Sequence, residues 1–379
     1  GKVMFLADSE EPGSADESPP GQEYPEISPV LLEAFDGDHA AIEGPYPDRW
    51  GVWISALEPI RSPETGEVVA VLGIDYSAKE WAESVSRIQR RGVMLTVLMV
   101  IGWLALVLLR VRWRKAVDRG SLDLGSDRIL RFGPPVTVFL LGAMGTLLAW
   151  SESDRRAKDG FRESLRQSGA QKALVVYRSF ERITHDLSML ARHIESDLPR
   201  LEEKRWRSFA EAVAQHPGVQ TVEWVPRIDS AKADSWRGDL GAGGRKGVKM
   251  YELQGAARVP VGPRREHFPI SLVEPMDGNE GIVGFDLGSE NSRLETIRKA
   301  CDMGFPRASK LVNLVEGGAG LIIFAPVFAN QAQCKTQEGR RRNLQGFAVG
   351  AYWPVAVFTT EIGRLVDRGS GIRVEDLSA

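Results

Sequence analysis

Two long uncharged runs constrain the fold of this chain more than any other feature. Residues 92–109 (GVMLTVLMVIGWLALVLL) and residues 132–151 (FGPPVTVFLLGAMGTLLAWS) contain no Asp, Glu, Lys or Arg. A helix that crosses a bilayer core needs about 20 mostly apolar residues, and a core helix of this length normally shows a polar face. We therefore expect two transmembrane α-helices, at 92–109 and 132–151. A hydrophobic hairpin inside a globular domain is the alternative.

The segment between the two runs predicts their orientation. Residues 110–131 hold seven Arg and Lys residues against three Asp residues. A short loop of this composition next to membrane spans is typical of the cytoplasmic side. The sequence therefore predicts a multi-pass protein of the inner (plasma) membrane, with the lipid bilayer as a partner and 110–131 as a short basic cytoplasmic loop. Residues 1–91 and 152–379 would both be extracytoplasmic.

The composition is that of globular domains and excludes several kinds of site. A length of 379 residues suggests two or three domains, and a net charge of -3 argues against nucleic acid as a partner. With only Cys301 and Cys334, a disulfide framework or Cys-rich zinc site is excluded, while a single disulfide stays open. The five histidines lack ligand spacing, so we expect no metal. The chain opens at Gly1 without an initiator Met, so we expect a fragment.

Residues 1–91 combine an acidic start, rich in Pro, Gly and Ser, with a predicted β-hairpin. The runs WGVWISALEPI (50–60) and EVVAVLGIDY (67–76) are rich in β-forming residues. They are joined by RSPETG, which is typical of a turn. A helix is expected from Tyr76 to Arg91, leading directly into the first uncharged run.

This hairpin resembles the C-terminal hairpin of the extracytoplasmic PAS-like sensor domains of bacterial receptors. The resemblance rests on the WG pair, a turn that carries TG, and an apolar strand that ends in Gly-x-Asp. It implies that residues 1–91 are part of a PAS-like sensor domain, with Trp50, Trp53 and Asp75 as candidate ligand contacts. The alternative is that both tryptophans lie in the core and that Asp75 caps the next helix.

Residues 152–379 begin with an amphipathic pattern of unusual length. Apolar residues recur mainly every three or four positions over about 152–197, which predicts a stalk helix roughly 60 Å long. A second helix, RWRSFAEAVAQ, stops at His216-Pro217-Gly218, and the alternating run GVQTVEWVPRI predicts a strand. Mixed strands and helices follow. This order predicts an α+β domain with an antiparallel sheet.

Several spaced motifs in this region resemble, in the same order, those of the CHASE domain. They are HPGVQTVEWVPRI, FPISLVEPMDGNEGIVGFDLGSE, a helix that ends in CDMG, GLIIFAPVF and LQGFAVG. The resemblance covers about residues 155–375. CHASE domains are extracytoplasmic sensors of bacterial histidine kinases, diguanylate cyclases and adenylate cyclases, and of plant cytokinin receptors. The resemblance implies a stalk helix followed by PAS-like lobes with antiparallel sheets, and a homodimer formed through the stalk helices.

The resemblance also implies candidate ligand-binding residues. Cytokinin-binding relatives hold a small planar ligand with one acidic residue and one hydroxyl residue on a following strand, and these positions correspond to Glu274 and Ser309. The sequence departs from that pattern at Glu274-Pro275 and in the longer DGNE turn, so cytokinin specificity is not transferred. Trp224, Tyr251 and Asp286 complete the candidate set.

The chain shows no catalytic motif. It has no phosphoacceptor-histidine box, no ATP-binding glycine box and no GG-[DE]-EF motif, and the carboxylates Glu223, Glu274 and Asp286 lack an accompanying nucleophile or base. We therefore expect Asp286 to cap a helix and Glu223 to face solvent, with no catalytic residue and no cofactor in this chain. ATP and Mg²⁺ would be needed only by a kinase domain elsewhere in the full-length protein.

The resulting expectation is the sensory portion of a transmembrane signalling receptor that binds a small-molecule or peptide ligand. A two-component sensor histidine kinase, acting through a phosphorelay on a response regulator, is the first expectation for the full-length protein. The sensory portion of a diguanylate cyclase, a membrane-anchored periplasmic enzyme and a structural anchor are the alternatives.

Overall fold

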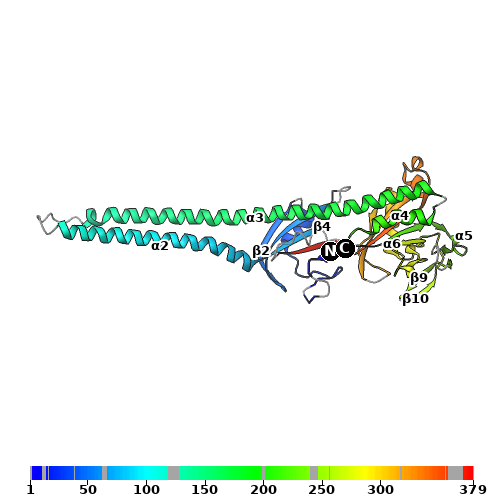
Figure 1. The fold of residues 1–379 in the computed structure, drawn as a ribbon, viewed down its shortest axis with the longest axis horizontal. Helices are drawn as coiled ribbons and strands as arrows, with labels where there is room; N and C mark the ends of the chain where they lie inside the picture. The colour runs from blue at the N-terminus through cyan, green and yellow to red at the C-terminus, as the bar shows by residue number, and fades with distance from the viewer. Residues whose placement is uncertain are drawn as a thin grey trace. The chain divides into compact units, whose positions relative to one another are not determined.

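A computed structural model gives the chain a mixed α/β fold (Figure 1). The structure describes residues 2–378 apart from 11–13, 16, 38, 62–65, 118–127, 199–200, 240–245, 256, 316–317, 355 and 357–369. The chain divides into two compact units. Unit 1 comprises Gly1–Ala41, Leu57–Ile74 and Gly169–Ala379, and unit 2 comprises Ile42–Ala56 and Asp75–Ser168.

The described helices and strands have the following bounds. The helices are α1 (Pro29–Asp36), α2 (Ala78–Val117), α3 (Arg128–Asp197), α4 (Glu203–Ala214), α5 (Ser230–Ala233), α6 (Asn291–Met303) and α7 (Gln337–Asn343), with the 3-10 helices η1 (Glu280–Ile282), η2 (Leu287–Ser289) and η3 (Gln331–Gln333). The strands are β1 (Lys2–Asp8), β2 (Ala41–Asp48), β3 (Gly51–Arg61), β4 (Val68–Ser77), β5 (Val219–Pro226), β6 (Ile228–Asp229), β7 (Gly238–Asp239), β8 (Lys246–Val248), β9 (Tyr251–Gln254), β10 (Ala257–Pro260), β11 (Glu266–His267), β12 (Leu272–Glu274), β13 (Arg307–Ala308), β14 (Val312–Asn313), β15 (Ala319–Phe328), β16 (Leu344–Tyr352) and β17 (Ser370–Ser378).

In unit 2, α2 and the first part of α3 pack against each other. The rings of Trp103 and Phe139 lie 4.6 Å apart between centroids, and the hydroxyl of Thr146 donates a hydrogen bond to Sδ of Met99 over 3.2 Å. Figure 1 shows the two helices side by side along this stretch. The uncharged run 92–109 lies within α2, and the run 132–151 lies within α3. The two runs therefore contact each other as a helical hairpin.

This arrangement corrects the membrane part of the sequence prediction. Among the described residues, no helix combines the length and the apolar character that a membrane span requires. The predictions of two transmembrane helices and of a multi-pass inner-membrane protein are therefore wrong. Residues 118–127 of the predicted basic loop lie outside the described residues. Each run is one section of a longer helix, α2 or α3, that carries charged residues beyond both ends of the run. The length of an uncharged run does not reveal whether lipid or another helix packs against it.

Unit 1 contains the N-terminal sheet. Strands β1, β17, β4 and β3 lie side by side in that order, and in unit 2 strand β2 lies beside β3. The two predicted strands of the hairpin are therefore observed as β3 and β4. Helix α1 begins where the side chain of Ser28 accepts a hydrogen bond from the N–H of Leu31, with Pro29 at the first helical position.

Unit 1 also contains the six-stranded lobe, which we define as residues 201–352. Its sheet has the order β12-β5-β16-β15-β13, with β14 also paired to β15, and each of these pairings is antiparallel. Successive side chains of a strand point to opposite faces of a sheet. The central strands β5, β16 and β15 carry apolar residues at both sets of positions, so that the sheet is covered on both faces.

One face of this sheet packs against α3 and α4. Trp206 and Ala210 of α4 and Leu187 of α3 are fully buried against Trp224 of β5 and Ala348 of β16. In α4 the buried residues follow helical spacing, which is why this helix lies flat on the sheet.

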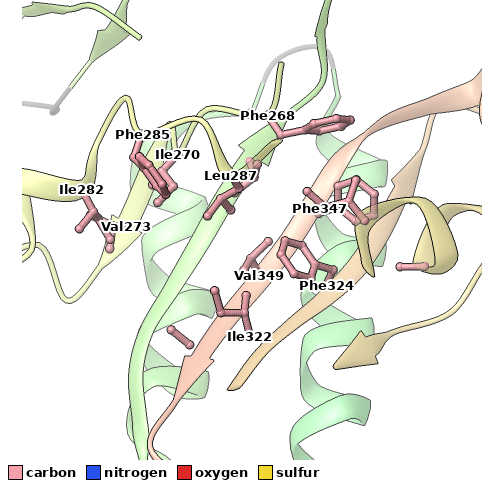
Figure 2. Close-up of a cluster of buried hydrophobic side chains, with 14 of the residues drawn as sticks. Phe268, Ile270, Val273, Ile282, Phe285, Leu287, Ile322, Phe324, Phe347 and Val349 are labelled. Atoms are coloured by element: carbon pink, nitrogen blue, oxygen red, sulfur yellow. The ribbon is translucent and has the colours of Figure 1, made fainter. Parts of the chain in front are cut away.

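The opposite face packs against α6 and the segments that precede it. Figure 2 shows its aromatic and aliphatic side chains, in which the ring of Phe347 lies 5.9 Å from that of Phe268 and 6.0 Å from that of Phe324. Phe285 and Leu287 belong to the same buried cluster. Helix α6 ends at Met303 because Gly304 adopts a left-handed conformation with φ 81°. The sheet therefore separates a side covered by α3 and α4 from a side covered by α6. The α6 side holds the candidate site.

Candidate functional site

The α6 side of the six-stranded lobe contains a buried polar network centred on Asp286. The side chain of Asp286 is fully buried. Its Oδ1 accepts hydrogen bonds from the N–H of Phe268 over 2.8 Å and from the N–H of Gly288 over 3.0 Å. Its Oδ2 lies 2.8 Å from Nδ1 of His267, which is also buried. The bond to Gly288 makes Asp286 the N-cap of η2, so the predicted capping role is confirmed.

Asp286 is placed by backbone contacts as well as by its carboxylate. Its N–H donates to the carbonyl of Tyr251, and the N–H of Tyr251 donates to the carbonyl of Gly284, both over 2.9 Å. Gly284 has φ 88°, and a Cβ there would lie 2.7 Å from the carbonyl oxygen of Lys249. Only glycine permits this close approach. Residues 284–286 are therefore fixed beside the start of β9.

A charged pair extends the network toward the surface. Nη1 of Arg264 lies 2.6 Å from Oε2 of Glu252 and 3.7 Å from Oδ2 of Asp286. The N–H of Gly262 also donates to Glu252 over 3.2 Å. Burial by itself raises the pKa of the Glu252 carboxyl, but the hydrogen bonds from Arg264 and Gly262 and the charge of Arg264 outweigh it, so the net pKa is lowered. Glu252 is therefore held as a carboxylate.

Tyr251 carries the aromatic part of this region. Its hydroxyl donates to the carbonyl of Gly281 over 2.7 Å, and its ring lies 5.7 Å from that of Phe285. The guanidinium of Arg258, an exposed residue of β10, lies 4.8 Å above the Tyr251 ring. An arginine over an aromatic face is attracted by the ring electrons. Tyr251 and Asp286, both predicted as ligand contacts, are thus brought together beside the Glu252–Arg264 pair.

Two further charged side chains are buried on this side of the lobe. Glu223 of β5 is 4% exposed and accepts a hydrogen bond from the hydroxyl of Thr221 over 2.8 Å. The expectation that Glu223 faces solvent is therefore wrong, because β5 is covered on both faces. Arg293 of α6 is 1% exposed, donates to the carbonyl of Asn313 over 2.6 Å and lies 5.2 Å over the ring of Phe285.

The other predicted contacts lie elsewhere in the lobe. Trp224 is buried on the helix-covered face, against α3 and α4. Glu274 lies at the end of β12, with Oε2 3.2 Å from Nη1 of Arg207 in α4. Burial raises the pKa of Glu274, and the charge of Arg207 opposes the rise only in part. Trp224 and Glu274 therefore belong to the contact between the sheet and α4.

Ser309 lies at the opposite edge of the sheet from Glu274. It follows β13, and its hydroxyl accepts a hydrogen bond from the N–H of Ile322 over 3.0 Å. Strands β12 and β13 are the two edges of the order β12-β5-β16-β15-β13. Four strand spacings of about 4.8 Å separate them by about 19 Å. The structure does not bring Glu274 and Ser309 together around one small ligand.

The candidate contacts of the N-terminal region form two small groups in unit 2. Oδ1 of Asp48 accepts hydrogen bonds from the N–H of Trp50 over 2.8 Å and from the indole N–H of Trp53 over 2.9 Å. Both tryptophans are half-buried. The hydroxyl of Ser55 donates a short hydrogen bond to Asp75, which is 8% exposed. The tryptophans and Asp75 are therefore held by different partners.

His267, Arg264 and Glu252 were not identified from the sequence. The three residues lie within 16 positions of one another but on different segments, so no local spacing marks them. Among the described residues, no group of three or more His, Cys, Asp or Glu side chains is arranged to hold a metal ion. Cys301 and Cys334 are both free and buried, and burial raises the pKa of the Cys301 thiol to about 11.

Comparison with known proteins identifies this region. Residues 199–378 match the model of the CHASE domain family. A 199-residue stretch of the chain is also 24% identical to a protein named Hybrid signal transduction histidine kinase A, from Dictyostelium discoideum. This alignment covers 50% of the chain and 9% of that relative. The chain thus contains a CHASE domain, and the match supports a sensory role in a signalling receptor.

Replacing Asp286 tests the network directly. The Asp286→Ala substitution should lower the free energy of unfolding by about 3 kcal/mol, because it leaves two buried N–H groups and His267 without their acceptor. Asp286→Asn, which keeps one acceptor oxygen, should cost less. Urea unfolding measures both values, and Asp277→Ala, at an exposed carboxylate, is the control. Equal stability of Asp286→Ala and Asp277→Ala would contradict the assigned role.

Glu252 should make stability depend on pH in the acid range. Its pKa in the folded state lies below the ordinary value of 4.5. The amount that ionised Glu252 adds to the free energy of unfolding is therefore fully present above pH 4.5 and is lost as the pH falls through the folded-state pKa. The Glu252→Gln variant should therefore lose less stability than the native chain on acidification below 4.5. Thermal unfolding at a series of pH values measures this. Glu338→Gln, at an exposed carboxylate of α7, should follow the native curve.

Proposed function

We propose that the six-stranded lobe is the ligand-binding part of a signalling receptor and that its ligand contacts Tyr251, Arg258 and the Glu252–Arg264 pair. The observation that supports this most is the position of the pair inside a CHASE domain, at the partly exposed end of the Asp286 network. Small-molecule sites combine apolar and aromatic surface with a few fixed polar groups. The α6 side supplies both kinds of group.

The hydrogen bonds and the exposure of these side chains support ligand binding rather than catalysis. Asp286 accepts hydrogen bonds from three donors, so its oxygens are already engaged, and no nucleophile accompanies it among the described residues. The Glu252–Arg264 pair, in contrast, is about one-eighth exposed at Glu252 and one-quarter exposed at Arg264. A ligand at this end would meet a carboxylate, a guanidinium and an aromatic ring whose positions are fixed in advance. Such preorganisation lowers the entropic cost of binding.

The same lobe is tied to α3 at two points, which gives a ligand-dependent change a route to this helix. Oε1 of Glu195 in α3 accepts hydrogen bonds from the N–H of Phe328 over 2.8 Å and from the side chain of Gln331 over 2.7 Å. Nε2 of His216, just before β5, lies 2.8 Å from Oδ2 of Asp186 in α3. A shift of the central strands would therefore act on α3 through Glu195 and Asp186. Packed helices that slide by a small amount are a common form of such switching.

A thermal-shift experiment on the whole chain tests the ligand site. Defined panels of amino acids, dicarboxylates and purines serve as probes, and a bound probe raises the unfolding temperature. We expect at least one probe to do so in the native chain, and expect Arg258→Ala and Glu252→Gln each to weaken its binding about tenfold or more. Lys299→Ala, on the exposed face of α6, is the matched control. A probe whose shift survives both substitutions would place the site elsewhere.

We further propose a histidine kinase as the output of the full-length protein, with a diguanylate cyclase as the second candidate. The name of the Dictyostelium discoideum relative supports this choice. This proposal implies two protein partners. One is a second copy of the chain, bound through α3, and the other is a response regulator.

The output is tested by incubating the product of the complete gene with labelled ATP or with GTP. Acid-labile, base-stable phosphorylation of the protein is expected, because phosphohistidine has that stability. Formation of cyclic di-GMP from GTP without self-phosphorylation would contradict the kinase proposal and favour the cyclase.

A further inference from the structure

Strand β17 occupies a central position in the N-terminal sheet, although it comes from the other end of the sequence. It lies between β1 and β4. Its pairing with β1 is antiparallel, with Lys2 opposite Ser378, Met4 opposite Asp376 and Asp8 opposite Arg373. Strand β17 also lies within residues 199–378, the part of the chain that matches the CHASE domain model.

The other edge of β1 is already occupied, so β17 is what connects β1 to the rest of the sheet. The N–H of Phe5 donates to the carbonyl of Gln22, and the N–H groups of Gly21 and Tyr24 donate to the carbonyls of Phe5 and Val3, over 2.8–2.9 Å. Among the described strands, β17 alone separates β1 from β4. Without it, β1 and β4 would each present an unpaired edge. Unpaired strand edges are templates for another strand.

The burial of β4 is that of an interior strand. Ala70, Val71, Leu72 and Ile74 are all buried, so both faces of the strand are covered. In β1, the alternating residues Val3, Phe5 and Ala7 are buried as well. Buried backbone N–H and C=O groups need hydrogen-bond partners. These two strands therefore need a strand between them.

We propose that residues 370–378 act as a donor strand that completes the N-terminal sheet, so that β1 and β4 form an acceptor for an extended segment of the region that matches the CHASE domain model. The occupant is the chain's own β17, because the register pairs it with β1 at six positions, with a bulge between Phe5 and Ala7 of the acceptor strand. Main-chain hydrogen bonds supply the affinity in this type of strand addition. The shared sheet also connects the CHASE region to β4, which is followed directly by α2.

Cross-strand disulfide formation tests the proposal in the full chain. Cys301 and Cys334 are first replaced by Ala, and Met4→Cys is then combined with Asp376→Cys. Opposed Cα atoms of an antiparallel pair are about 4.5–5.5 Å apart, within the range that a disulfide spans. We expect mild oxidation to give a disulfide between positions 4 and 376 within one chain, identified by mass spectrometry of peptides. Met4→Cys with Arg373→Cys is the matched control, because these positions lie about 10 Å apart along the strands.

Each outcome decides the proposal. A disulfide between positions 4 and 376 of two different chains would show that a second copy donates the strand, and would overturn donation within the chain. Equal crosslinking of the control pair, or none of the expected pair, would overturn the register. Hydrogen exchange of a Val374→Pro variant provides a second measurement that needs no cysteine. Amides of β1 and β4 should exchange about tenfold faster or more, while those of β15 and β16 stay unchanged. Unchanged exchange in β1 and β4 would also overturn the proposal.

Discussion

Through its carboxylate and its backbone N–H, Asp286 holds together three segments on the α6 side of the six-stranded lobe. Its oxygens bind the backbone after β11 and the first turn of η2, and its N–H binds the carbonyl of Tyr251 at the start of β9. A fully buried carboxylate is costly unless its hydrogen bonds are satisfied, and here each oxygen has a partner. His267 and Arg264 lie beside this side chain, and Tyr251 is held by the backbone N–H of the same residue.

The two faces of the six-stranded sheet have different roles. On one face, Trp206, Trp224 and the Arg207–Glu274 ion pair fix the sheet to α4 and α3. The α6 face carries the buried polar groups and the aromatic ring that a ligand could use. A change on the α6 face must pass through β5, β15 or β16 to reach α3. These strands are closely packed on both sides, and interiors of this density transmit small displacements.

Local sequence patterns were sufficient to predict single elements. Alternation identified β5, the stop at His216-Pro217-Gly218 marked the end of α4, and Gly304 marked the end of α6. Two of the predicted ligand contacts, Tyr251 and Asp286, lie close together in the structure, where the N–H of Asp286 donates to the carbonyl of Tyr251. The predicted elements depend on residues close together in the chain, because strand alternation and helix termination are set by neighbouring residues.

The features that sequence analysis missed depend on long-range packing. Strand order decides that Glu274 and Ser309 lie at opposite edges, and sequence does not encode that order in any local pattern. Burial of Glu223 and Arg293 follows from the segments that cover β5 and α6. The uncharged runs of α2 and α3 were assigned to a membrane from their length and lack of charge, which are properties of the local sequence alone. The same limit applies to β17, whose neighbours lie at the other end of the chain.

Native mass spectrometry tests the central claim, that the Tyr251–Glu252–Arg258–Arg264 surface binds a small ligand, most directly. The full chain is incubated with a small-molecule extract of cells and is then freed of unbound material. We predict a discrete mass increase that is retained by the Arg207→Ala variant, on the α4 side of the sheet, and lost by the Arg258→Ala variant. A mass increase that Arg258→Ala retains and Arg207→Ala loses would contradict the claim and would place the site between the sheet and α4.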